Sequence, residues 1–173
     1  MIENIFITGR PGCGKTTLIM EIIKELNLSI GGFYTAEIRG RGERKGFKII
    51  DLEGEEGILA NTELESPYKV GKYKVNLKDL EEIGVKSVLD AINKNKIVII
   101  DEIGKMELFS ERFKKAVKEA INSKNKVLGT IKLAKDPFIE KIKNRKDTKI
   151  FYLTEGHFEQ IKTEIIKILG QSL

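Results

Sequence analysis

Gly9-Arg10-Pro11-Gly12-Cys13-Gly14-Lys15-Thr16 fits the pattern G-x-x-x-x-G-K-[ST] in full. The β-branched and aromatic run at residues 2–8 predicts a buried strand before it, and apolar residues recur at helical spacing over residues 15–26 after it. A glycine-rich loop in this position turns backbone N–H groups and the positive end of the helix toward phosphate oxygens. The chain is therefore expected to open with a phosphate-binding loop, a P-loop, between its first strand and first helix.

Individual side chains of this loop have distinct expected roles. Lys15 would reach the β- and γ-phosphates of a nucleotide, the Thr16 hydroxyl would coordinate Mg²⁺, and Thr17 would add a hydroxyl near the α-phosphate. Cys13 stands at a variable position, so we interpret it as a small packing residue, with a redox switch as the alternative.

A P-loop needs an acidic partner for Mg²⁺, and the apolar run at residues 97–100 ends in Asp101. A run without alternation predicts a strand buried on both faces, with Asp101 at the carboxyl end where ligands bind in parallel sheets. Asp101 is thus the Walker B candidate, accepting from Thr16 or from a Mg²⁺-bound water. Glu102 follows directly, and a carboxylate there can orient a water toward the γ-phosphate and take its proton. The alternative for Glu102 is a turn cap or a surface ion pair.

Two further candidates come from later in the chain. Thr130 follows the apolar residues at 127–129 and is either a polar sensor near the γ-phosphate or attacking water, or a buried strand threonine. Arg145 is the first candidate for a positive charge on the transition state, with a solvated surface arginine as the alternative.

The rest of the pattern predicts an α/β fold in a single domain over residues 1–173. Residues 31–60 predict an antiparallel hairpin addition, and residues 61–76 an irregular stretch. Asn76 or Asp79 would cap a helix that runs to about residue 93. Later helices are expected at residues 110–123, 137–143 and 155–169, and later strands at 126–131 and 149–153.

Composition narrows the class of protein. The net charge of +5 comes from 31 basic and 26 acidic residues, which is a mixed surface. One cysteine and one histidine exclude a disulfide framework and a zinc cluster, and no apolar run is long enough to span a bilayer. We expect a monomeric cytoplasmic protein with no membrane partner. Abundant Lys and Glu favour a thermophilic source.

The sequence resembles a family of small P-loop nucleoside-triphosphatases first described from thermophiles, which includes the cancer-related nucleoside-triphosphatase. The resemblance rests on the P-loop and on four other stretches: residues 32–39 with Gly46 and Phe47, residues 70–76, residues 101–108, and residues 128–131 with Asn144 and Arg145. They span nearly the whole chain, and the strings at 32–37 and 101–108 are specific to this family.

The resemblance implies a RecA-like P-loop fold with a mostly parallel central sheet flanked by helices. It also implies Mg²⁺-dependent hydrolysis of nucleoside triphosphates such as ATP, GTP and CTP, with low base specificity and Glu102 as the catalytic carboxylate. The implied nucleotide-binding residues are Gly9, Arg10, Pro11, Gly12, Cys13, Gly14, Lys15, Thr16, Thr17, Ile99, Ile100, Asp101, Glu102, Ile103 and Gly104. An ion pair between Lys105 and Glu107 is our hypothesis for the role of these two residues in the signature.

Two alternatives stay open. Nucleotide kinases have a similar loop sequence, and Arg39, Arg41 and Arg44 in the hairpin tip could take the place of the arginine-bearing lid of a kinase. Glu102 would have no evident role in such an enzyme. A nucleotide-regulated RNA- or DNA-binding module is suggested by the same arginines beside aromatic residues. A solvated hairpin tip over a core stripe is the interpretation we favour, so nucleic acid is a possible but not the favoured partner.

Overall fold

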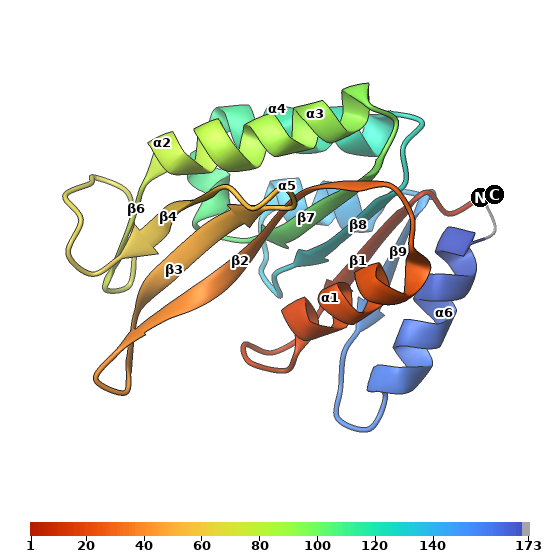
Figure 1. Ribbon diagram of the computed structural model, residues 1–173, viewed down its shortest axis with the longest axis horizontal. Coiled ribbons are helices and arrows are strands. Elements are labelled where there is room, and N and C mark those ends of the chain that lie inside the picture. The colour runs from red at the N-terminus through yellow and green to blue at the C-terminus, as the bar shows by residue number, and fades with distance from the viewer. Residues whose placement is uncertain (171–173) are drawn as a thin grey trace.

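The predicted first strand is β1 (Asn4–Thr8), and all five of its residues are buried. The structure, a computed structural model, describes residues 1–170, and within them nine strands form one sheet in the order β5-β6-β4-β3-β2-β7-β8-β1-β9. Helices lie on both faces of this sheet, but on one face they cover only the end that contains β1 and β9 (Figure 1). The predicted α/β fold is confirmed.

Five strands run parallel and carry the P-loop at one end. Besides β1 they are β2 (Ile30–Gly40), β7 (Ile97–Ile103), β8 (Val127–Ile131) and β9 (Thr148–Tyr152). β8 lies between β1 and β7, so the strand that precedes the P-loop and the strand that contains Asp101 are not direct neighbours. The register between β7 and β8 shifts between Ile100 and Ile103, and the peptide bond between Asp101 and Glu102 is cis.

The antiparallel extension is the part of the sheet beyond this parallel half. β2 pairs with β7 in parallel over its first residues and then with β3 in antiparallel from Phe33 to Gly40. The further strands are β3 (Glu43–Asp51), β4 (Glu56–Asn61), β5 (Lys69–Val70) and β6 (Tyr73–Val75). The predicted addition is confirmed, but it is larger than expected, because residues 61–76 contain the short strands β5 and β6 where we expected irregular structure.

Each face of the sheet has its own hydrophobic core. α1 (Lys15–Leu26) and α6 (Phe158–Gly170) cover the face to which Ile5 and Ile7 of β1 point. Phe6 points to the other face and packs in the core beneath the remaining helices. These are α2 (Leu77–Asp79), the π-helix η1 (Leu80–Val85), α3 (Lys86–Asn93), the short 3-10 helix η2 (Glu107–Phe109), α4 (Glu111–Asn122) and α5 (Pro137–Lys143).

Most predicted helix limits agree with the structure. Of the two candidate caps, Asn76 is the one that begins α2, because its side chain accepts from the Asp79 N–H. α6 begins at Phe158, three residues later than predicted, because residues 155–156 form a turn. No helix within residues 1–170 combines the length and the apolar character that crossing a membrane requires.

Candidate active site

The P-loop runs from the end of β1 into the first turn of α1. Gly12 and Gly14 have φ angles of 76° and 100°, which only glycine adopts readily. Gly14 is the N-cap of α1 and has no side chain, so no side-chain cap occupies the first N–H groups of this helix. These N–H groups and the positive end of the helix are therefore available to an anion.

Lys15 curls back over the loop. Its Nζ donates to the carbonyl oxygens of Gly9 and Arg10, at 3.1 and 3.3 Å. This position places the ammonium group directly above the loop backbone. A phosphate bound by the loop N–H groups would therefore meet a fixed positive charge.

Asp101 is the centre of a buried hydrogen-bond cluster at the carboxyl ends of the parallel strands. Thr16 Oγ1 donates to Asp101 Oδ2 at 2.7 Å, and Thr130 Oγ1 donates to Asp101 Oδ1 at 2.6 Å. Thr130 reaches Asp101 because β8 lies next to β7. Burial raises the pKa of Asp101 to about 6, although both hydroxyl hydrogen bonds oppose the shift.

Replacing Asp101 with asparagine is expected to raise the free energy of unfolding at pH 8 by about 2 kcal/mol. Burial raises the pKa of Asp101 from 3.8 to about 6, so the buried negative charge destabilises the folded state by about 3 kcal/mol. Asparagine removes this charge but also one of the two oxygens that accept from the threonine hydroxyls, and the lost hydrogen bond costs about 1 kcal/mol. The folded state binds the proton more tightly, so this charge penalty grows as pH rises from about 4 to 6. The advantage of the asparagine variant should therefore shrink toward pH 4.

Urea unfolding of both proteins at pH 8 and at pH 4 measures this difference, and the other titrating groups are common to both. An asparagine variant that is less stable than the wild type at pH 8 would contradict the account.

Glu102 near the end of β7 and Glu107 just after this strand bring two carboxyl groups close together. Glu107 is only 3% exposed, and its Oε1 accepts from the Gly104 N–H at 3.1 Å. Burial and the nearby charge of Glu102 raise the pKa of Glu107 well above its ordinary value. The hypothesised ion pair with Lys105 is not among the ion pairs of residues 1–170; Glu107 instead holds the turn through Gly104.

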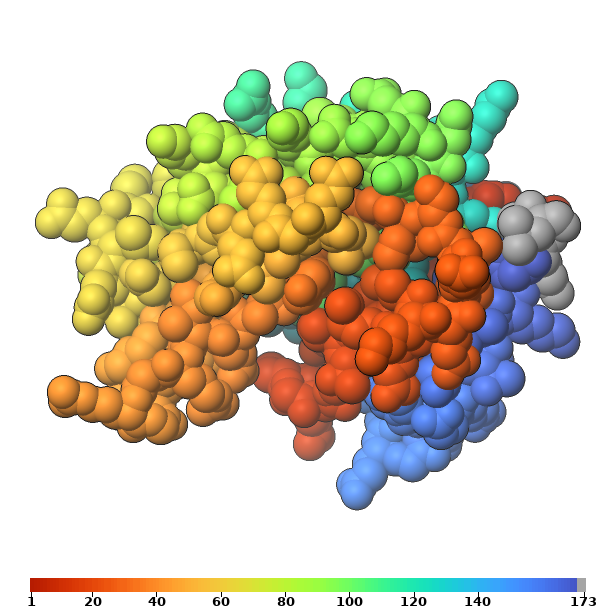
Figure 2. Space-filling model, in the orientation of Figure 1, coloured from red at the N-terminus to blue at the C-terminus, as the bar shows by residue number. Residues whose placement is uncertain are grey.

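A cleft of about 800 Å³ lies between the P-loop and the antiparallel extension. Figure 2 shows the red P-loop and the orange hairpin on the two sides of a notch in the surface. The predicted site residues that line this cleft are Gly9, Arg10, Pro11, Gly12, Gly14, Lys15, Thr16, Thr17, Asp101 and Glu102. Its volume lies in the range of ordinary small-molecule sites, about 300 to 1,000 Å³.

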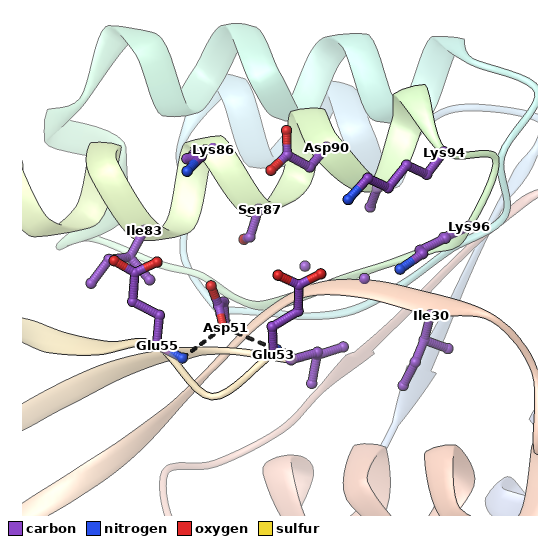
Figure 3. A pocket seen from close by; sticks show the side chains of 14 residues that line it. Ile30, Asp51, Glu53, Glu55, Ile83, Lys86, Ser87, Asp90, Lys94 and Lys96 are labelled. Atoms are coloured by element: carbon purple, nitrogen blue, oxygen red, sulfur yellow. Dashed lines mark hydrogen bonds between the residues drawn. The ribbon is translucent and has the colours of Figure 1, made fainter.

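A second cavity, of about 60 Å³, lies between the turn that joins β3 to β4 and helix α3. Figure 3 shows carboxylates and lysines around it, and Asp51 Oδ1 accepts from the N–H groups of Glu53 and Glu55 at 3.0 and 2.9 Å. This volume is far below that of a nucleotide site. The larger cleft is therefore the candidate active site.

Several predicted nucleotide contacts are not in the cleft. Ile99, Ile100 and Ile103 are fully buried in the two cores, so their side chains stabilise the sheet. Cys13 packs against the core beside α1, as the packing interpretation expected. Gly104 lies beneath Glu102 and Glu107, where an added Cβ would approach both carboxylates within 2.8 and 3.1 Å.

Arg145 lies at the wrong end of the sheet for its predicted role. It binds Asp147 through Nε and Nη2, both at 2.9 Å, and Asn122 through Nη1 at 2.8 Å. The Asp147 carbonyl in turn accepts from Asn4 at the start of β1, whereas the P-loop follows the end of β1. The interpretation of Arg145 as a transition-state cation is therefore wrong for this chain. Arg145 instead stabilises the amino end of the parallel sheet through these hydrogen bonds, and its hydrogen bonds and charge lower the pKa of Asp147.

The far wall of the cleft was missed by reasoning from the sequence. It consists of residues of the antiparallel extension and of the turns after β7 and β8: Tyr34, Thr35, Ala36, Glu37, Arg44, Phe47, Leu59, Val70, Gly71, Tyr73, Lys105, Met106, Glu107, Lys132 and Leu133. The signal existed, because the family strings at residues 32–39 and 70–76 contain several of them without an evident structural task.

A protein-family model described as NTPase matches residues 4–166. The chain belongs to this NTPase family. It is 56% identical to the nucleoside-triphosphatase THEP1 of Thermotoga sp. (strain RQ2), over 96% of this chain and 95% of that protein. It is 36% identical to the human cancer-related nucleoside-triphosphatase, over 99% of each chain. The crystal structure of THEP1 from Aquifex aeolicus matches with a TM-score of 0.88 and 35% identity, covering 96% of this chain and 98% of that one. The expected family is confirmed.

Proposed function

We propose that this chain hydrolyses nucleoside triphosphates to diphosphates and inorganic phosphate, with Mg²⁺ as cofactor. The observation that carries the proposal is the meeting of the P-loop, Asp101 and Glu102 in one cleft of sufficient volume. The names of the similar proteins, which are nucleoside-triphosphatases in Thermotoga and in humans, support it.

The donor set fits Mg²⁺. Thr16 donates its proton to Asp101, which leaves the lone pairs of its hydroxyl oxygen free for a cation. Within residues 1–170 there is no group of three or more His, Cys, Asp or Glu side chains that could hold a metal. We therefore expect Thr16 to be a direct ligand and Asp101 to act through a bound water, with phosphates and water completing the shell, as Mg²⁺ prefers. When bound, the ion would supply charge neutralisation at the β- and γ-phosphate oxygens.

Other residues of the chain would bind the phosphates, position Asp101 and activate the attacking water. The P-loop N–H groups and Lys15 hold the phosphates, and Thr130 fixes the Asp101 carboxylate in place. Glu102 lines the cleft directly beyond Asp101, where it would orient a water in line with the γ-phosphate and accept its proton. Phosphate contacts are common to all nucleotides, so we expect ATP, GTP and CTP to be hydrolysed with little discrimination.

Phosphate release from a panel of nucleoside triphosphates tests this function and separates it from a kinase. We expect release that requires Mg²⁺, is abolished by EDTA and is unchanged by added nucleoside monophosphates. The formation of diphosphate from the added monophosphate, without free phosphate, would instead identify a nucleotide kinase.

The alternative of a nucleic-acid-binding module depends on the hairpin arginines. Arg39 and Arg44 both form ion pairs with Glu37, at 2.9 and 3.3 Å. Among the ion pairs of residues 1–170, Arg41 is therefore the tip arginine without a carboxylate partner. No other observation favours nucleic acid, so we do not propose this function.

A further inference from the structure

Arg44 of β3 is held in a defined position on the far wall of the cleft. Its Nε donates to the Tyr73 hydroxyl at 2.9 Å, and its Nη1 donates to Glu37 Oε1 at 3.3 Å. The guanidinium carbon lies 5.2 Å from the ring centroid of Phe47 and 5.6 Å from that of Tyr73. These contacts come from three strands, β2, β3 and β6, so the geometry depends on the antiparallel extension being folded.

The same contacts leave part of the guanidinium available. Among the hydrogen bonds of residues 1–170, none uses the Nη2 group of Arg44, and the side chain is 41% exposed. The hydrogen bond with Tyr73 raises the pKa of Arg44 above its ordinary value, so the group remains cationic. A stacked and anchored guanidinium loses little conformational entropy when it binds an oxyanion.

The order of the strands places this group on the side of the γ-phosphate. Asp101 and Glu102 lie near the carboxyl end of β7, and this strand lies between the P-loop strand β1 and the extension. A triphosphate in the P-loop, with its γ-phosphate beside Glu102, therefore points its terminal oxygens toward the wall that carries Arg44.

We propose that Arg44 is a catalytic arginine supplied by the chain itself, whose Nη2 donates to the γ-phosphoryl oxygens in the transition state. Charge spreads over these oxygens as the phosphoryl group transfers, and an arginine at this place stabilises it. The proposal rests on the proposed function, and it gives Arg44 the role that the sequence suggested for Arg145.

Two lysines of the cleft are less suited to this role. Lys105 and Lys132 also line it, but among the hydrogen bonds of residues 1–170 their ammonium groups have no partner that fixes them. A lysine presents a flexible point charge, whereas a held guanidinium presents N–H groups in a fixed plane.

The test compares Arg44→Ala with Arg39→Ala. Arg39 lies on the same hairpin and binds the same Glu37, but it does not line the cleft. We expect Arg44→Ala to lower kcat by about 10²- to 10³-fold, with the Kd of the nucleoside diphosphate unchanged. Affinity for the diphosphate with Mg²⁺ and aluminium fluoride, which mimics the transferring phosphoryl group, should fall by the same factor. Arg39→Ala should behave as the wild type in all three measurements, and Arg44→Lys should recover only part of kcat.

The outcomes separate this proposal from the function on which it rests. The absence of phosphate release by the wild-type chain overturns both. Release that Arg44→Ala leaves unchanged, an equal loss in Arg39→Ala, or an equal loss of affinity for the diphosphate with and without aluminium fluoride overturns the role of Arg44 alone.

Discussion

Replacing Glu102 with glutamine is expected to lower kcat for nucleoside triphosphate hydrolysis by about 10²- to 10⁴-fold. Glutamine keeps the shape of the side chain in the cleft but cannot accept a proton from water. Because Glu102 makes no contact with the P-loop in our account, the Kd for the nucleotide should not change. Loss of kcat without loss of affinity is the signature of a group that acts only in the transition state.

Steady-state phosphate release and a nucleotide titration measure the two quantities. Glu111→Gln is the matched control, because Glu111 lies on α4 with its side chain 84% exposed and does not line the cleft. Turnover of Glu102→Gln at the wild-type rate would remove Glu102 from the mechanism. A cap or surface ion pair would then be the better interpretation.

Replacing Lys15 with alanine is expected to reduce both affinity and turnover. The ammonium group lies over the loop backbone, within hydrogen-bond distance of the Gly9 and Arg10 carbonyls. A phosphate bound there gains a charge-assisted hydrogen bond before the reaction and a stronger one as charge develops. We expect kcat to fall by about 10²- to 10³-fold, with a marked rise in the Kd of the nucleotide.

Fluorescence titration with a labelled nucleotide, together with phosphate release, measures both effects. Lys24→Ala on the same helix α1 is the control, because Lys24 is exposed near the other end of this helix. A Lys15 variant that binds nucleotide as tightly as the wild type would contradict the phosphate contact.

Features that depend on neighbouring residues were predictable from the sequence. The P-loop needs glycines such as Gly12 and Gly14 where the backbone has positive φ. These glycines are adjacent in sequence to the other residues of the loop, so a short sequence pattern is enough to identify it. The apolar run before Asp101 likewise predicts a buried strand, because burial on both faces leaves no polar alternation. The family strings were sufficient to recognise the family.

Features that depend on strand order were not predictable in the same way. Thr130 reaches Asp101 only because β8 lies next to β7, and no local sequence pattern predicts that strand order. The prediction for Arg145 was wrong for the same reason, because its position in the sequence does not indicate at which end of the sheet it lies. Arg44 and Tyr73 meet across 29 residues through pairing of the extension, which the prediction of irregular structure had hidden.

Hydrolysis in ¹⁸O-labelled water tests the central claim most directly, because it shows which atom is attacked and by what. The wild-type chain is incubated with Mg²⁺ and a nucleoside triphosphate in labelled water, and the products are analysed by mass spectrometry. We expect one labelled oxygen in the released phosphate and none in the diphosphate, because water held by Glu102 attacks the γ-phosphorus. Label in the diphosphate, or no release of phosphate, would contradict it.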